Sequence, residues 1–205
     1  MLYFNKSLTP NVTRMKSDDS DGQLQEWQVL KRDLVLERSP WFSLWRETIR
    51  LPDGRQIDDY YQFEQRDYVE IAAWQDGRVL GFWRYKHGPR RVNLGLPAGY
   101  LENGEEPLAA ACRELREEAG LASENWRHLG SYNLDGNRGP ARAHLFAALD
   151  CRTIAALPSD DLEEQTGVWL TPQQWGEHLA AGKVVTLGAA VAVYAGILAL
   201  SQPAD

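Results

Sequence analysis

Three glutamates near the middle of the chain are the residues best suited to carry chemistry. Glu117 and Glu118 follow Glu114 at three and four positions, so a helix would place the three carboxylates on one face. Hard cations such as Mg²⁺ take oxygen ligands and favour carboxylates together with a substrate's phosphate oxygens. A solvated acidic helix face has the same spacing. The glutamates alone therefore leave a metal site and an exposed surface both open.

The helix that carries these glutamates is predicted to run from 107 to 119. Pro107 stands in its first turn and Gly120 follows its end. Proline at the start and glycine just past the end are typical of helices. Apolar residues gather on the side opposite the glutamates, as in a helix that lies on a core. This stripe consists of Leu108, Ala111, Cys112, Leu115 and Ala119, and Cys112 is therefore expected in the core and not as a nucleophile.

The segments around this helix predict a sheet with helices packed against it. Short β-branched and aromatic runs alternate with turn signals, of which Pro52-Asp53-Gly54 and Asp76-Gly77 favour hairpins. Strands interspersed with helices in this way indicate an α+β architecture with a mixed sheet. Further along the chain, the pattern predicts strands over 143–149 and 168–170 and a helix over 172–181, after Thr171.

A charge-free run from 184 to 200 has two interpretations. It reads VVTLGAAVAVYAGILAL, which is near the minimum length for a membrane span. Its Ala, Gly and Val residues give only a weak tendency to insert into a bilayer. Thr186 before Leu187 is typical of a helix N-cap and would shorten the helix. We therefore expect a helix buried in a core or a subunit contact, and no membrane association.

Composition excludes several classes of protein. The chain has 205 residues, of which 43% are hydrophobic and 25% charged, as in ordinary globular proteins and unlike disordered or fibrous ones. A net charge of −7 argues against binding nucleic acid through bulk electrostatics. The two cysteines, Cys112 and Cys151, are too few to stabilise a fold of this size through disulfides. The N-terminus lacks the apolar run of a signal peptide. Reduced thiols and a cytoplasmic location are expected.

The wider spacing around the glutamates matches a known motif. Gly99, Glu105, Arg113-Glu114-Leu115, Glu117-Glu118 and Gly120-Leu121 stand at the positions of a complete Nudix box. The chain therefore resembles the Nudix hydrolase superfamily, whose members cleave a nucleoside diphosphate linked to another moiety. The resemblance implies an α+β fold in which an α/β/α sandwich encloses a mixed central sheet.

The resemblance also implies roles for individual residues. Mg²⁺ is the implied cofactor, with Mn²⁺ as a possible substitute. Arg113 corresponds to an arginine that orients the ligand carboxylates, and Glu105 to an acid that supports the metal cluster. The implied metal ligands are Glu114 and Glu118, with Glu117 as a further one, together with the backbone carbonyl of Ala98.

Upstream of the box, the sequence RVLGFWRYKHGPRRVNLGLPAGY (78–100) resembles the ADP-ribose pyrophosphatase and nucleotide-sugar branch of this superfamily. LPDGRQIDDYYQFE (51–64) is similar to that branch's N-terminal β subdomain. The implied substrate is ADP-ribose or another nucleoside diphosphate sugar. The implied partner is a second copy of the chain in a homodimer. The organisation expected is a flexible arm over 1–25, an antiparallel β subdomain over 26–66 and a hydrolase domain over 67–202.

In that branch the side chain at position 86 contacts the substrate phosphates, and aromatic residues of the N-terminal subdomain stack on the base, often in the partner's site. Lys86 is therefore the expected phosphate contact, and Trp41, Trp45 and Tyr61 are candidates for base stacking. The same aromatic residues could instead fill the sheet core and a dimer contact.

The chain departs from the branch pattern at three places. Gly95 stands where an acidic residue is common, and Lys86 where arginine is common. Gly139-Pro140 reverses the usual Pro-Gly order, with basic residues nearby in place of an acid. Another nucleotide sugar, a dinucleotide or an RNA 5′ end stays open as the substrate, as does a module that only binds ADP-ribose. The intact box carboxylates favour catalysis.

A general base is expected outside the box. Glutamates that hold a metal are poor bases, and related hydrolases place a glutamate base in the loop before the final strand. The loop PSDDLEEQ (158–165) carries the candidates. We favour Glu164 and then Glu163, because glutamate side chains extend further than those of the neighbouring aspartates.

Overall fold

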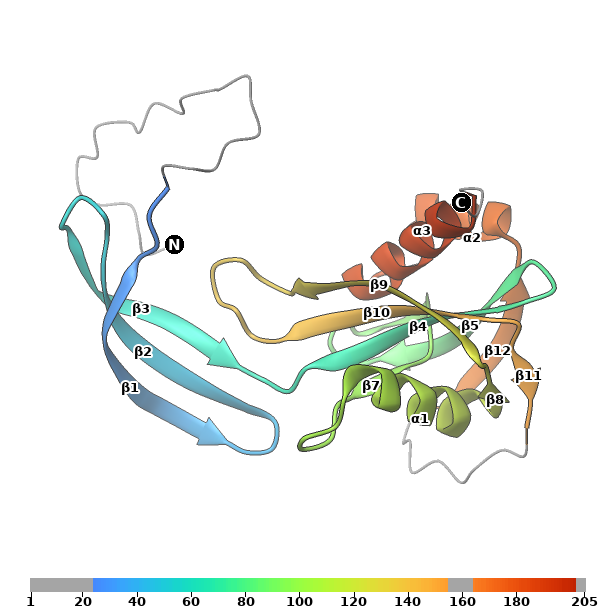
Figure 1. Ribbon diagram of the computed structural model, residues 1–205, viewed down its shortest axis with the longest axis horizontal. Helices are drawn as coiled ribbons and strands as arrows, with labels where there is room; N and C mark the ends of the chain where they lie inside the picture. Colours follow the sequence, from blue (N-terminus) through green and yellow to red (C-terminus); the bar gives the residue numbers. More distant parts are fainter. Residues whose placement is uncertain (1–23, 155–163, 202–205) are drawn as a thin grey trace, which may run out of the picture.

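The computed structural model describes residues 24–154 and 164–201, and the predicted arm over 1–25 lies almost wholly outside these ranges. A three-stranded N-terminal sheet precedes a larger sheet flanked by helices (Figure 1). The strands are β1 (Gln28–Arg38), β2 (Phe42–Arg50), β3 (Gln56–Glu64), β4 (Tyr68–Gln75), β5 (Arg78–Lys86), β6 (Arg91–Gly95), β7 (Ala98–Tyr100), β8 (Leu121–Ala122), β9 (Asn125–Asn133), β10 (Arg142–Leu149), β11 (Arg152–Thr153) and β12 (Gln165–Leu170), and the helices are α1 (Pro107–Ala119), α2 (Pro172–Ala180) and α3 (Leu187–Ser201).

The larger sheet is mixed, as the sequence predicted. Within the described ranges it has seven strands in the order β12-β5-β4-β10-β9, with β6 paired to β5 and β7 paired to β4. β10 runs parallel to β4, whereas the other pairs are antiparallel. The register between β4 and β7 places Glu70 opposite Ala98 and Val69 opposite Gly99. This register brings the first glycine of the motif to the middle of the sheet.

Helices cover both faces of this sheet and make an α/β/α sandwich (Figure 1). On one face, α1 packs against a core that includes Ile71 and Leu115. On the other face, α2 and α3 pack against a core that includes Ala72, Trp175 and Ala192. Neighbouring residues of β4 point to opposite faces, so this strand contributes to both cores. The expected fold class is confirmed.

The buried side of α1 is narrower than the predicted stripe. Ala111 and Leu115 are buried, together with Ala110, but Leu108 is 44% exposed. Cys112 is half-buried, so its expected place in the core is wrong. Two of the three buried residues of α1 are alanines, and the helix contacts β4 and β7. A helix that rests on alanines lies close to the sheet, and fewer of its positions need to be apolar.

The predicted hairpin turns are confirmed. Asp76 and Gly77 form a two-residue loop between β4 and β5 with φ values of 49° and 72°. Positive φ at both positions is typical of a type I′ turn, whose twist matches that of the flanking strands. Gly54, with φ of 86°, provides the corresponding conformation between β2 and β3.

The N-terminal sheet joins the sandwich through the loop between β9 and β10. The backbone N–H of Phe63 donates to the carbonyl of Arg138 at 3.2 Å. The side chains of Tyr60 and Gln62 both donate to the carbonyl of Asn137, at 2.7 Å and 3.1 Å. The end of β3 and this loop therefore form one connected unit beside the sandwich (Figure 1).

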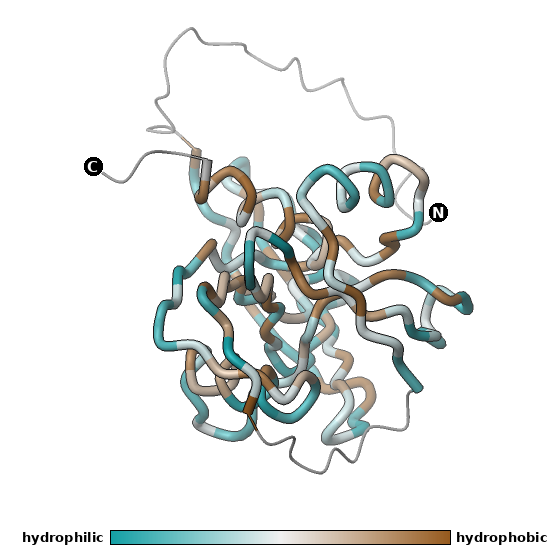
Figure 2. Tube along the Cα trace, turned by 90° about the vertical axis from the view of Figure 1, so that its right-hand side faces the viewer, coloured by the Kyte–Doolittle hydropathy of each residue, from teal (hydrophilic) through white to brown (hydrophobic). Residues whose placement is uncertain are grey.

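The C-terminal apolar run forms α3 and starts at Leu187, directly after Thr186, as expected. Ala189, Ala192 and Val193 are buried against the sheet, so the helix is a core element. No helix in the described ranges is both long and apolar enough to cross a membrane. In Figure 2 hydrophobic stretches run through the body of the molecule, and hydrophilic residues concentrate in turns.

Candidate active site

The glutamates of α1 lie directly over β7. The carboxylate of Glu114 rests on Gly99, and a Cβ at position 99 would overlap it. Only glycine leaves this space open, because every other residue carries a Cβ. The first glycine of the motif is therefore required by contact with the helix that carries the other motif residues.

Arg113 holds the acidic residues of the motif together. Its guanidinium donates to Glu105 at 2.9 and 3.0 Å, to Glu114 at 2.6 Å and to Glu117 at 3.1 Å. It also donates to the carbonyl of Tyr100 at 3.0 Å. These bonds raise the pKa of Arg113 and lower that of Glu105. The orienting role that the resemblance implies for Arg113 is consistent with this geometry.

Glu118 is bound at both carboxylate oxygens. Its Oε1 accepts from Nη1 of Arg84 at 3.0 Å, and its Oε2 accepts from the backbone N–H of Ala98 at 3.1 Å. Both side chains of the ion pair are almost fully buried. Glu118 therefore has one fixed orientation, next to the Ala98 backbone that the resemblance assigns to the same metal site.

The donor set at β7 fits a hard divalent cation. Glu114, Glu118 and the Ala98 backbone present oxygen atoms at one short strand, and oxygen is the ligand that Mg²⁺ prefers. Within residues 24–154 and 164–201, no three Asp, Glu, His or Cys side chains form a ready metal-binding group. The carboxylates are instead paired with arginines, Glu118 with Arg84 and Glu114 and Glu117 with Arg113.

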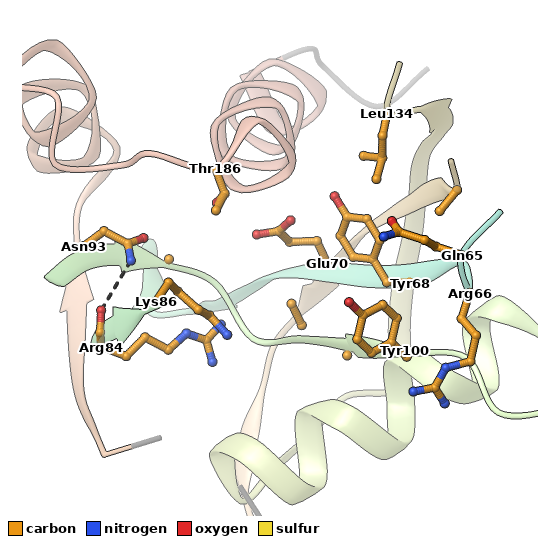
Figure 3. Close-up of a pocket in the computed structure, with 14 residues that line it drawn as sticks. Gln65, Arg66, Tyr68, Glu70, Arg84, Lys86, Asn93, Tyr100, Leu134 and Thr186 are labelled. Carbon is orange, nitrogen blue, oxygen red and sulfur yellow. Dashed lines mark hydrogen bonds between the residues drawn. The ribbon is translucent and has the colours of Figure 1, made fainter. Parts of the chain in front are cut away.

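A cavity of about 290 Å³ opens beside this cluster (Figure 3). Its volume is close to the lower end of the range for small-molecule sites. One end is mainly aromatic and apolar, and there Arg66 lies over the ring of Tyr100 at 4.8 Å. The other end is polar. The aromatic end includes Tyr68, Tyr100 and Leu134, and the polar end includes Glu70, Arg84, Lys86, Asn93 and Thr186.

Glu70 is a buried acid on the cavity wall, only 5% exposed. Burial raises the pKa of its carboxyl to about 8, and Arg84 partly opposes this shift. The carboxylate lies against the first turn of α3, where a Cβ at Gly188 would overlap it. The same Cβ would lie 2.7 Å from the hydroxyl of Tyr68. Glu70 therefore connects the cavity to the start of α3.

The structure brings some of the predicted site residues together. Lys86 lines the cavity, on the same strand as Arg84 (Figure 3). Trp41 is 67% exposed in the turn after β1. Trp45 donates to Glu64 at 2.7 Å in the N-terminal sheet, and Tyr61 lies in β3. The described lining of this cavity does not include these three aromatic residues.

The two candidate bases have different positions. Glu164 is exposed and directly precedes Gln165. The amide of Gln165 donates to the carbonyl of Glu118 at 3.2 Å and accepts from Arg84 at 3.3 Å. Glu164 is thus adjacent to the end of α1. Glu163 lies outside the described residues.

Sequence reasoning missed three polar residues of the cavity. Glu70, Arg84 and Asn93 are all at most 5% exposed, within apolar strands. A charged residue inside an apolar strand is the signal that could have found the first two, in YVEIAAW and GFWRY. Asn93, which donates to the carbonyl of Arg84 at 3.3 Å, has no comparable signal.

Comparison with known proteins places this geometry in a family. The family model described as "NUDIX domain" matches residues 65–186. A second model, "Nucleoside diphosphate sugar hydrolase N-terminal domain", matches residues 27–63. The two matches correspond to the sandwich and to the N-terminal sheet.

Individual relatives agree with these matches. An ADP-ribose pyrophosphatase of Mycobacterium tuberculosis is 27% identical over 172 residues, covering 79% of this chain and 81% of the relative. A CMP-5'-(N-acetyl-N-hydroxy-3-aminopropyl)phosphonate hydrolase of Streptomyces rubellomurinus is 25% identical over 161 residues, 78% of each chain. The crystal structure of an ADP compounds hydrolase has the same fold, with a TM-score of 0.76 at 21% identity over 86% of this chain and 95% of that one.

Proposed function

The chain belongs to the Nudix hydrolase family, and we propose that it hydrolyses the pyrophosphate bond of ADP-ribose or a similar nucleoside diphosphate sugar. The products are a nucleoside monophosphate and a sugar phosphate. The observation that carries the proposal is the grouping of the motif carboxylates beside a cavity: Glu114 and Glu118 lie against β7, and Arg113 joins Glu105 and Glu117 to them. The match of residues 27–63 to a sugar-hydrolase domain supports the substrate class.

Divalent cations are part of this chemistry, and when bound they neutralise phosphate charge and lower the pKa of water. We propose Mg²⁺, with Mn²⁺ as a substitute. Glu114, Glu117, Glu118 and the carbonyl of Ala98 are the groups that would hold the cation. Arg113 keeps these carboxylates in place through the bonds described above. The position of Lys86 in the cavity supports a contact with the substrate's phosphates.

A carboxylate outside the motif accepts the proton of the attacking water in this proposal. Carboxylates committed to a cation are poor bases, which leaves Glu164 as our first choice and Glu163 as the second. The place of Glu164 next to Gln165, which contacts both Glu118 and Arg84, supports this choice.

We also propose that the active molecule is a homodimer in the cytoplasm. In this proposal Trp41, Trp45 and Tyr61 of the N-terminal sheet stack on the base in the cavity of a partner, as the resemblance to the nucleotide-sugar branch implies. The free thiols of Cys112 and Cys151 are consistent with a reducing compartment.

The test is release of nucleoside monophosphate from a panel of ADP-, GDP- and UDP-sugars, dinucleotides and capped RNA. We expect hydrolysis of ADP-ribose or a close relative with Mg²⁺, and its loss in EDTA. Glu118→Gln should lower kcat by about 100-fold or more, because a ligand carboxylate becomes a neutral amide. Glu177→Gln, at an exposed helical position of α2, is the matched control.

Other outcomes would redirect the proposal. Preference for a dinucleotide or for capped RNA would move the activity to another nucleoside diphosphate derivative. Binding of ADP-ribose without turnover would indicate a module that only binds it. Wild-type turnover by Glu118→Gln would contradict the metal assignment.

A further inference from the structure

Arg84 is a buried positive charge paired with Glu118, at the edge of the acidic cluster. It projects from β5 into the cavity, on the same side as Lys86 (Figure 3). Only 5% of the residue is exposed, although arginine is rarely buried unless it is paired. Removing a guanidinium from water is costly, so its partners must fix its position.

Three separate parts of the chain hold this guanidinium. Nη1 donates to Glu118 of α1 at 3.0 Å and to Gln165 of β12 at 3.3 Å. Nη2 donates to the carbonyl of Leu96, just before β7, at 2.5 Å. The guanidinium also lies over Gly95, whose Cβ would be 3.9 Å from it. Arg84 is therefore anchored even without its bond to Glu118.

This anchored charge competes directly with a cation for Glu118. The Oε1 atom of Glu118 accepts from Arg84, and the Oε2 atom accepts from the Ala98 N–H. A divalent cation on the same carboxylate would lie within a few ångströms of the guanidinium. Repulsion between like charges is strong where water is excluded, and both side chains of the pair are nearly buried. Substrate phosphates would offset it, because they add negative charge at the same place.

We infer that Arg84 is a built-in counter-charge of Glu118 that weakens cation binding to the free protein, so that the divalent cation and the phosphate-bearing substrate bind together. Arg84 is a positioning residue in this scheme, because it acts through Glu118. The part of the inference that rests on the proposed function is that the cation and the substrate bind together. The effect of Arg84 on the cation alone does not require that the substrate be known.

The first test measures binding of Mn²⁺ alone, from the electron paramagnetic resonance signal of the free ion. Arg84→Gln should bind Mn²⁺ about tenfold or more tightly than the wild type, because a unit charge near the ion is removed. Arg152→Gln is the control: it removes one positive charge from an exposed pair with Glu124, away from the cavity, and should change the affinity less than about threefold. Arg84→Lys keeps the charge and should resemble the wild type. Damage to the fold would weaken binding, so a gain of affinity cannot come from a purely structural role.

The second test uses the wild-type protein and stays informative if Arg84→Gln does not fold. A non-hydrolysable methylene analogue of ADP-ribose at saturation should tighten Mn²⁺ binding by about tenfold or more. In a folded Arg84→Gln variant this coupling should be smaller. Equal Mn²⁺ affinity with and without bound analogue, or equal or weaker affinity in folded Arg84→Gln, would overturn the inference. Failure of the wild type to hydrolyse ADP-ribose would instead count against the proposed function and leave the comparison with Mn²⁺ alone intact.

Discussion

At the scale of single residues, Glu70 and Arg84 line the cavity and Glu118 of α1 lies behind them, bonded to Arg84. Arg84 pairs with Glu118 at 3.0 Å, and both affect Glu70. Burial is the largest cause of the raised pKa of Glu70, Arg84 partly opposes it, and Glu118 adds to it. Because burial is the largest influence, ionising the Glu70 carboxyl inside the fold costs stability.

Glu70→Gln should become more stable relative to the wild type as the pH rises from about 4.5 to 8. The carboxyl has a pKa of about 8 in the fold against 4.5 for an ordinary glutamate. Across this window the folded protein keeps a proton that the unfolded chain releases, so wild-type stability falls with rising pH. Glutamine has no such dependence. The expected gain is on the order of 1–4 kcal/mol, measured by urea unfolding in EDTA.

Glu124→Gln, at an exposed glutamate paired with exposed Arg152, is the control and should show little change over the same range. A constant difference in unfolding free energy between Glu70→Gln and the wild type, from pH 5 to pH 8, would contradict a raised pKa for Glu70.

The motif residues could be predicted from the sequence because their chemistry is local to one loop and helix. The spacing of Glu114, Glu117 and Glu118 places them together whatever the rest of the chain does. Glu70 and Arg84 reach the same site only through pairing of β4 with β7 and of β5 with β12. The register of these strands cannot be predicted from the sequence, because strands of similar pattern can pair in several ways.

At the scale of secondary-structure elements, α3 contacts the sheet through two glycines in different surroundings. At Gly188 a Cβ would overlap the Glu70 carboxylate. At Gly196 a Cβ would meet the indole nitrogen of Trp74 at 3.5 Å and Ala72 at 3.6 Å, which are ordinary contact distances. The first turn of the helix is therefore tightly fitted and the later part is not.

Gly188→Ala and Gly196→Ala should change stability in opposite directions. We expect Gly188→Ala to lower the unfolding free energy by about 1–3 kcal/mol, because the new methyl group displaces Glu70 or the helix. Gly196→Ala should raise it by up to about 1 kcal/mol, since alanine favours the helix and fits the space. Urea unfolding of both variants at one pH measures the difference. Equal effects would show that the start of α3 adapts without cost.

Most elements were predictable, and the exceptions have physical reasons. The starts of α1, α2 and α3 follow from Pro107, from Thr171 before Pro172, and from Thr186 before Leu187. The exposure of Leu108 did not follow from periodicity, because the width of the buried stripe depends on how closely a helix approaches its sheet.

At the scale of the whole molecule, the N-terminal sheet has an incompletely covered apolar face. Val29 and Leu34 of β1 are about half exposed, at 52% and 49%. Their cross-strand partners are Ile49 and Trp45, so all four side chains share one face. A three-stranded sheet gains little stability from a face left in water. This exposure supports the proposed homodimer.

Light scattering at micromolar concentration should give twice the mass of one chain. A stable dimer of this kind buries well over about 1,000 Å² in total. Leu34→Asp places a charge on the apolar face and should shift the protein toward the monomer. Val92→Asp, at an exposed valine of β6 in the sandwich, is the matched control and should stay dimeric. A wild-type monomer would contradict the proposal.

The loop between β9 and β10 contacts the N-terminal sheet and also forms part of the cavity wall. Its Asn137 carbonyl accepts bonds from Tyr60 and Gln62 of the N-terminal sheet, while Leu134 and Ala141 at its ends line the cavity. The orientation of the N-terminal sheet and the shape of the cavity rim are therefore mechanically linked. Binding of a second subunit to the sheet would therefore change the affinity of the cavity for its ligand. By reciprocity, ligand binding in the cavity would change the free energy of subunit association by the same amount.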